Sequence, residues 1–274
     1  GFHLPNLYHT RWWVTGPPKR GKSTLLCSNP HVLVVDGEGK CCCVQGGVAN
    51  YFVPKTLSDI DQMVDWLEKE GRAGRHPVKM VGFDTVDELV QGFIIPGLTE
   101  EVRRDHPRFD GYDVRDWKSG EKGSGGWDMV TGRMLSWLRR IYNAGYGWWA
   151  NGHIKEYQDG KELKTKASVN PALASGLHRA AEFLARVDLL EKSSVVSSPI
   201  LKDGKPLLKP DGSPLMAPQT VFTTTGGLAL VQKKAESSSD IGQNLCLPDK
   251  IEWTREGGWG IIEKLYVSAH KEFE

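Results

Sequence analysis

The sequence predicts an α/β fold with a mostly parallel central sheet flanked by helices. Three observations predict it. Short apolar runs recur at residues 12–14, 32–36 and 78–84. Segments with apolar residues at helical spacing lie between these runs, and the second and third runs each end in an aspartate. Such alternation of apolar strands and amphipathic helices is typical of a parallel sheet covered by helices.

The first run, Trp12 to Val14, leads into G-x-x-x-x-G-K-S at residues 16–23, and an apolar segment that can begin a helix follows. Strand, glycine loop and helix form the context in which this motif binds the phosphates of a nucleoside triphosphate. Glycines let the backbone N–H groups turn toward an anion, and the helix dipole favours negative charge. A chance glycine-rich turn is the alternative, which the flanking strand and helix disfavour. The predicted nucleotide contacts are Gly16, Pro17, Pro18, Lys19, Arg20, Gly21, Lys22, Ser23 and Thr24.

The motif assigns chemistry to particular side chains. Lys22 is expected to reach the β- and γ-phosphates of ATP, and the Ser23 hydroxyl to ligate Mg²⁺. Asp84 ends an apolar run and is expected to hold the same Mg²⁺, with a helix N-cap as the alternative. Glu38 follows the run that ends at Asp36. A carboxylate there can orient or deprotonate the water that attacks the γ-phosphate, although a solvated turn residue fits the spacing equally well.

The first half of the chain continues with a short strand at residues 50–54 and a helix at 56–71. Leu57, Ile60, Met63, Val64 and Leu67 form one face of that helix, and Thr56 or Ser58 can cap it. A strand at 78–85 and a helix at 86–93 come next. Residues 96–126 mix glycines and charges without a clear apolar period, which predicts a long mobile loop or lid.

The second half begins with a helix at 127–142 and a strand at 145–153. Residues 154–176 contain a D-G turn and predict an exposed hairpin or mobile loop. A helix leads into a strand over 177–192, and the D-G turns and prolines of 193–218 predict a hairpin insertion. Further strands follow, and the last twenty residues are expected to form a helix. We expect a single domain over 1–274.

Composition narrows the function classes. The 274 residues carry a net charge of +1, with 25% charged and 39% hydrophobic residues. This balance argues against a strongly basic nucleic-acid binder but allows a local basic strip. No membrane span or signal peptide is expected. Five cysteines, three of them adjacent, make a poor disulfide framework. We therefore expect free thiols and a cytoplasmic protein.

Taken together, the segments "GPPKRGKST", "VVDGEGK", "VGFDTVDEL" and "GWWANGH" resemble the RecA-like ATPases, and more closely the small phage members used in single-strand annealing recombination. The resemblance implies that Glu38 is catalytic, that Asp84 belongs to the magnesium strand, and that Asn151 or His153 senses the γ-phosphate. It also implies a homo-oligomer in which Lys233 and Lys234 reach the neighbouring subunit's γ-phosphate, and a location in the host cytoplasm if the protein is phage-encoded. A solvated turn is the alternative for these two lysines.

The same resemblance makes residues 154–176 and 100–126 DNA-facing loops. The lysines of the first loop are expected to meet phosphates of single-stranded DNA, and aromatic residues in both loops can stack on bases. These residues are Lys155, Lys161, Lys164, Lys166, Tyr157, Tyr112 and Trp117. Solvated loops are the alternative.

Two other classes of function stay open. A P-loop kinase of a small molecule would use an arginine-bearing lid, for which Arg103, Arg104 and Arg108 are candidates. A nucleotide-switched accessory ATPase would bind ATP and act through a protein partner.

Overall fold

A computed structural model describes residues 6–41, 50–107, 111, 113–117, 125–159, 162–202, 205–230, 247–248, 250–254 and 257–271. Its centre is a nine-stranded sheet with the order β11-β10-β7-β1-β5-β4-β2-β3, in which β6 pairs with β5 outside this path. The strands from β7 to β3 pair in parallel, whereas β10, β11 and β6 pair antiparallel. The predicted α/β fold with a mostly parallel sheet is confirmed.

The strands of this sheet are β1 (Arg11–Gly16), β2 (Val32–Asp36), β3 (Tyr51–Phe52), β4 (Met80–Asp84), β5 (Gly147–Asp159), β6 (Glu162–Ala167), β7 (Phe183–Pro199), β10 (Met216–Leu230) and β11 (Lys250–Trp253). The helices are α1 (Lys22–Cys27), α2 (Leu57–Arg72), α3 (Val86–Leu89), α4 (Ile95–Asp105), α5 (Gly126–Asn143), α6 (Pro171–Ala180) and α7 (Gly258–Lys271), with a π-helical turn at Val90–Ile94 and 3-10 turns at Leu7–His9 and Val114–Asp116.

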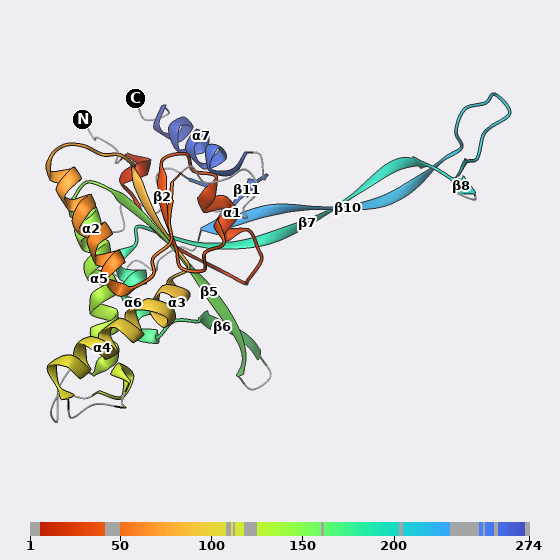
Figure 1. Ribbon diagram of the computed structural model, residues 1–274. Coiled ribbons are helices and arrows are strands. Elements are labelled where there is room, and N and C mark those ends of the chain that lie inside the picture. The colour runs from red at the N-terminus through yellow and green to blue at the C-terminus, as the bar shows by residue number, and fades with distance from the viewer. Residues whose placement is uncertain are drawn as a thin grey trace.

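Two hydrophobic cores lie on the two faces of the sheet. The alternation of side chains along β1 sends Trp13 into one core, with α2 and α5, and sends Trp12 and Val14 into the other, with α1 and α7. Figure 1 shows α2 and α5 well separated from α7 across the sheet. Trp12 is fully buried and stacks on Trp149 and Phe183 at centroid distances of 5.1 and 4.3 Å. The apolar run of the sequence is therefore a core strand.

Helix α2 forms for the reasons that its sequence predicts. The Thr56 side chain accepts a hydrogen bond from the Asp59 backbone N–H, and the Asp59 carboxylate accepts one from the Thr56 N–H. These reciprocal bonds satisfy two of the donors that a helix start leaves free. The five predicted apolar residues are all buried. Each fully buried aliphatic side chain contributes about 1.5–3 kcal/mol, so this face fixes α2 to the sheet.

The prediction of a loop over residues 96–126 is wrong for its first part, because helix α4 continues to Asp105. Leu98 and Val102 are spaced by one turn and bury against the core, together with Ile95. Similarly, residues 171–176 belong to α6 rather than to a loop. The Asn170 side chain accepts a hydrogen bond from the Ala172 N–H, and Pro171 occupies the first turn, which is a favourable helix start.

Strands β7 and β10 extend far beyond the sheet as a two-stranded arm (Figure 1). β7 pairs with β1 only over Phe183–Arg186, and β10 pairs with β11 only over Gly226–Ala229. Their mutual pairing continues from the sheet to Pro199 opposite Met216. Short strands β8 (Leu201–Lys202) and β9 (Lys205–Pro206) lie at the arm's tip. The predicted insertion at 193–218 thus lies in the outer half of a longer ribbon.

Two sequence expectations concern compartment. Cys27 and Cys41 are free and buried, whereas Cys42, Cys43 and Cys246 lie outside the described residues. None of the helices in the described ranges has the length and apolar character needed to cross a bilayer. A cytoplasmic location stays a prediction.

Candidate nucleotide-binding site

The glycine loop joins the end of β1 to the start of α1. A Cβ atom on Gly16 would lie 2.4 Å from the Val187 carbonyl oxygen, which leaves no room for a side chain. Gly21 has a φ of 93°, and a Cβ there would meet the Trp253 ring at 2.9 Å. Both glycines are therefore required by close approach, and Gly21 also by its backbone conformation. Between them, Pro18, Lys19 and Arg20 are exposed, and Arg20 lies 3.7 Å from Asp188.

Lys22 is buried, with 4% of its surface exposed. Its Nζ atom donates hydrogen bonds to the carbonyl oxygens of Gly16 and Pro17, both at 2.8 Å. Burial lowers the pKa of this ammonium group, and the charges of Asp84, Asp87 and Glu38 oppose the shift. A cation held on its own loop, without a direct carboxylate partner among the described residues, is suited to receive an anionic ligand.

Asp84 at the end of β4 lies close to two other predicted site residues, Asn151 and Ser23. Its Oδ1 atom accepts a hydrogen bond from Asn151 Nδ2 at 3.0 Å, and the Ser23 hydroxyl is close enough to lower the pKa of the Asp84 carboxyl. Burial raises the pKa of Asp84, whereas Ser23 and Asn151 lower it. The alternative role of Asp84 as a helix cap is not observed, because the Thr85 side chain accepts the capping bond from the Glu88 N–H.

Glu38 lies on a tight turn after β2. The Asp36 carboxylate holds this turn by accepting hydrogen bonds from the N–H groups of Glu38 and Cys41, at 3.2 and 2.6 Å. The Gly37 N–H donates to the Asp84 carbonyl at 2.9 Å, which ties the turn to β4. The Glu38 carboxylate accepts an ion-pair bond from Lys40, whose side chain is 74% exposed. Glu38 therefore has a fixed backbone and a side chain that is 25% exposed and pairs with an exposed lysine.

Strand β5 lies between β1 and β4, so its residues come close to the loop. Asn151 pairs in register with Val14, and His153 with Gly16. The Asn151 amide is fully buried, and its oxygen accepts a hydrogen bond from Trp149 Nε1 at 2.7 Å. The structure thus brings Lys22, Asn151 and Asp84 into one cluster, with His153 at its edge.

Asp87 is part of this cluster and was missed by the sequence analysis. Its Oδ2 atom accepts a hydrogen bond from the His153 backbone N–H at 2.8 Å and lies 3.7 Å from the ring Nδ1. Burial raises the pKa of Asp87, whereas the bond from His153 and the charge of Lys22 lower it. The sequence feature that could have indicated Asp87 is its position three residues after Asp84, in the first turn of the helix that follows β4.

Other predicted residues lie elsewhere. Lys233 and Lys234 fall outside the described residues, as do Arg108 and Tyr112. Arg103 and Arg104 are in α4, which is far from α1 in Figure 1, and Arg104 pairs with its neighbour Asp105. The structure gives no support to an arginine lid formed by these two side chains.

Comparisons with known proteins add to this description of the site. The family model described as AAA domain matches residues 9–213. No curated protein sequence matches the chain. Among solved structures it is similar to the flagellar accessory protein FlaH from Methanocaldococcus jannaschii, with 10% identity, a TM-score of 0.38, and coverage of 90% of this chain and 85% of that one. It is also similar to a KaiC-like protein from Pyrococcus horikoshii OT3, with 10% identity, a TM-score of 0.40, and coverage of 84% of this chain and 82% of that one. A third similar structure is the RadB recombinase, with 14% identity, a TM-score of 0.36, and coverage of 79% of this chain and 86% of that one.

Proposed function

The chain belongs to the AAA domain family, and we propose that it is a Mg²⁺-dependent ATPase that assembles on single-stranded DNA. ATP binding and hydrolysis follow from the family, and the predicted RecA-like P-loop fold agrees with the sheet. The magnesium ion, the DNA, the shared active site and a role in phage strand annealing are the finer parts of the proposal.

The observation that carries the proposal is the buried Lys22 ammonium inside the glycine loop, with Asp84, Asp87 and Glu38 close enough to act on its charge. Lys22 and the loop N–H groups bind the phosphates of ATP. Fixed donors in a water-poor site stabilise the charge that develops during phosphoryl transfer. Acids on the opposite side supply the base and the metal ligand.

Glu38 is the general base that takes the proton of the attacking water. The bonds from Asp36 hold its turn at the edge of the site, and its ion pair with exposed Lys40 costs little to break. The γ-phosphate sensor is His153 rather than Asn151. The Asn151 amide is engaged by Asp84 and Trp149, so it positions Asp84 and has less freedom to follow a ligand.

Ser23 and Asp84 hold the Mg²⁺. The Ser23 hydroxyl is close enough to Asp84 to lower the pKa of its carboxyl, and a hydroxyl with a carboxylate is an oxygen donor set of the kind that Mg²⁺ prefers. When bound, the ion neutralises negative charge on the phosphates.

Asp84→Asn should abolish most Mg²⁺-dependent hydrolysis and should raise the melting temperature of the nucleotide-free protein at pH 8. Burial is the main cause that raises the pKa of Asp84, so the folded state binds its proton more tightly than the unfolded state does. The ionised carboxylate therefore costs stability at pH 8, and this cost disappears as the pH falls through the raised pKa. We expect the gain in melting temperature to shrink between pH 8 and pH 4.

Asp59→Asn is the matched control. Backbone hydrogen bonds from Lys55 and Thr56 lower the pKa of Asp59, so its charge stabilises the folded state at pH 8 and this variant should melt earlier there. An Asp84→Asn variant that melts earlier at both pH values would contradict the burial argument. Full hydrolysis in that variant would remove Asp84 from the metal site.

The proposed function is tested by the ATPase rate with and without single-stranded DNA, measured together with the mass of the particle. We expect hydrolysis that requires Mg²⁺ and rises when DNA is added. Hydrolysis that ignores DNA, or that appears only with a protein partner, would replace this proposal with the nucleotide-switched accessory ATPase.

The hairpin of β5 and β6 supports the DNA-binding part of the proposal. β5 passes from Asn151 in the site directly into this hairpin (Figure 1). Lys155 pairs with Lys166, and Tyr157 lies two residues further along the same face. Lys166 Nζ lies 4.9 Å from the centre of the Tyr157 ring. A basic and aromatic face that continues from the nucleotide site fits single-stranded DNA, although Asp159 lies on the same face near the turn.

Reversing two charges on this face, Lys155→Glu with Lys166→Glu, should weaken single-stranded DNA binding by about tenfold or more at low salt, because two phosphate contacts are lost. The slope of log affinity against log salt should become shallower by roughly 0.7 for each lost contact. ATP affinity should not change. Fluorescence anisotropy of a labelled oligonucleotide over a salt series measures both quantities.

Lys55→Glu with Lys69→Glu is the control, because both lysines are exposed at or near α2 and away from the hairpin. Equal losses in the two variants would mean that net charge, and not the hairpin face, governs DNA binding.

The arm supports self-association. A two-stranded ribbon is marginally stable by itself in water, and its tip exposes 62% of Leu201 and 60% of Leu208. Leu207, Leu215 and Met216 add further exposed apolar surface at the tip. Exposed apolar patches of this kind mark interaction sites. The occupant that we propose is a second copy of the chain.

A mixing experiment tests whether subunits share an active site. Lys233→Ala/Lys234→Ala should bind ATP but hydrolyse it poorly, and adding Lys22→Ala subunits, which keep both lysines, should restore part of the activity. The reason is that a cation from a neighbouring subunit can contribute about 10³-fold or more to phosphoryl transfer. Introducing Leu201→Ser/Leu208→Ser into both proteins should lower the particle mass and prevent the rescue. Full activity of the double-lysine variant alone would confine catalysis to one subunit.

A further inference from the structure

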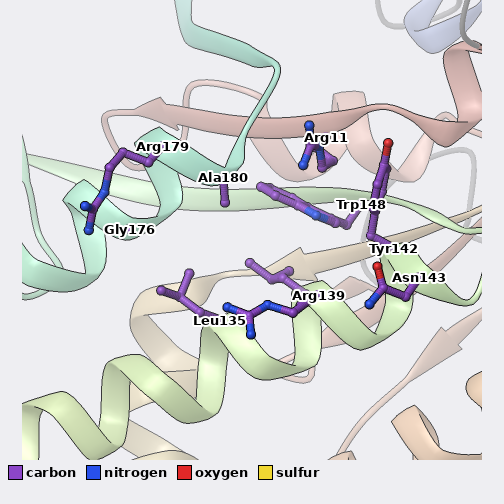
Figure 2. A pocket seen from close by; sticks show the side chains of 10 residues that line it. Arg11, Leu135, Arg139, Tyr142, Asn143, Trp148, Gly176, Arg179 and Ala180 are labelled. Carbon is purple, nitrogen blue, oxygen red and sulfur yellow. The ribbon is translucent and has the colours of Figure 1, made fainter. Parts of the chain in front are cut away.

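A pocket lies at the edge of the sheet opposite to the phosphate loop. β1 begins with Arg11 in this pocket and ends with Gly16 in the loop. Helices α5 and α6 form its walls, and the start of β5 closes it (Figure 2). Its volume is about 470 Å³, which is within the range of small-molecule sites. We call it the arginine pocket, after Arg11, Arg139 and Arg179.

The floor of the arginine pocket is apolar. Leu135 and Leu138 come from α5, Trp148 from β5 and Ala180 from the end of α6. Leu138 and Trp148 are each 1% exposed, so they form a dry surface at the base. Burial of an aliphatic group against this floor would be favourable by the hydrophobic effect.

Its rim is basic. Arg139 and Arg179 are exposed and come from α5 and α6, the two helices that flank the pocket in Figure 2. Among the arginines in the described ranges, only these two form no ion pair or hydrogen bond with another described residue. Arg11 pairs with Glu182 at 3.0 Å, but its Nε atom is buried without a hydrogen-bond partner. Among the described residues that line the pocket, none is acidic. These donors can therefore bind an anionic group.

The aromatic residues of the pocket offer little surface to a nucleic-acid base. The Tyr142 ring is stacked on His9 at 4.5 Å and has the Arg11 guanidinium 4.5 Å from its centre. Trp148 is almost completely buried. Base recognition requires an open aromatic face, so the occupant favoured by this geometry has an aliphatic body.

We propose that the arginine pocket binds a small organic anion that joins a phosphate or carboxylate group to an aliphatic body. Arg139 and Arg179 bind the anionic group, while Leu135, Leu138 and Trp148 contact the aliphatic body. This site is separate from the phosphate loop and from the proposed DNA face.

Isothermal titration calorimetry with octyl phosphate tests the proposal. The titration is performed with the phosphate loop filled by a non-hydrolysable ATP analogue, so that only other sites bind the probe. Octyl phosphate should bind at least about tenfold more tightly than inorganic phosphate or octanol. Inorganic phosphate keeps only the anionic group, and octanol keeps only the aliphatic chain. Octyl phosphate that binds no more tightly than inorganic phosphate would overturn the proposal.

Arg139→Gln/Arg179→Gln should weaken octyl phosphate binding by about tenfold or more, since two charge-assisted contacts are lost. Both side chains are exposed, so the melting temperature should match the parent protein. Arg72→Gln/Arg75→Gln removes two exposed arginines of and beside α2 and should leave binding unchanged. Equal affinity in the Arg139/Arg179 variant and the parent would place the probe elsewhere and exclude the arginine pocket.

Discussion

Replacing Lys22 with alanine or methionine is expected to weaken ATP binding by about 10²-fold or more, the scale of removing one partner of a buried charged contact. Lys22 is the buried cation of the glycine loop, and its ammonium group already lies between two loop carbonyls. Methionine keeps most of the apolar stem without the charge, so a common loss in both variants would be due to the charge. Calorimetry or a fluorescent ATP analogue measures the affinity.

Lys19→Met is the matched control in the same loop. Lys19 is also a predicted nucleotide contact, but its side chain is exposed, so the loss of a solvent-screened contact should change ATP affinity only a few-fold. Melting temperatures of all three variants separate binding from folding. ATP affinity that survives both Lys22 substitutions in a folded protein would disprove the phosphate-loop interpretation.

Strands β1, β2 and β4 could be predicted from the sequence because each is an apolar run with a glycine or an aspartate at its end. β2 and β4 end at Asp36 and Asp84, and their register pairs these two residues directly. The ends of neighbouring parallel strands share one edge of the sheet, so the glycine loop after β1 and Asp84 at the end of β4 could be assigned to one site from the sequence. Helix α2 was equally clear, since its apolar spacing and its capping residues agree.

The failures have a different cause. In α4, glycine and charged residues outnumber the few apolar positions that decide its state, and burial of Leu98 and Val102 against the core outweighs that composition. The contribution of Asp87 depends on how the helix after β4 turns back toward β5. That relation is a tertiary one, visible only when the His153 N–H is seen to donate to Asp87.

The arm shows a further limit. The turn residues predicted the tip of the hairpin. No local sequence pattern indicates that β7 and β10 stay paired over their whole length. Strand pairing depends on a partner strand distant in sequence, whereas turns depend on adjacent residues. Local sequence patterns therefore predict the position of the turn, but they predict a two-stranded ribbon that is shorter than the observed one.

Glu38→Gln should leave ATP binding nearly intact and slow hydrolysis by about 10²-fold or more, the contribution of a general base. Glutamine keeps the size and the hydrogen-bonding oxygen of the side chain but cannot take a proton from water. The backbone of the turn should not move, because the bonds that hold it come from Asp36 and from the Asp84 carbonyl rather than from the Glu38 carboxylate. Single-turnover kinetics at saturating ATP separates the chemical step from binding.

Glu88→Gln is the control that distinguishes a specific base from the general negative charge of the site. Glu88 is exposed, and its Cβ atom lies 3.3 Å from where a Cβ on Gly37 would be, so it is an acid beside the same turn. Its loss should change the rate only a few-fold, since a screened surface charge has a weak effect. Equal rate losses in the two variants would assign the effect to the local field. Parent-like hydrolysis in Glu38→Gln would make Glu38 a turn residue, and the base would then have to be sought at Asp87, the half-buried acid whose charge also acts on Lys22.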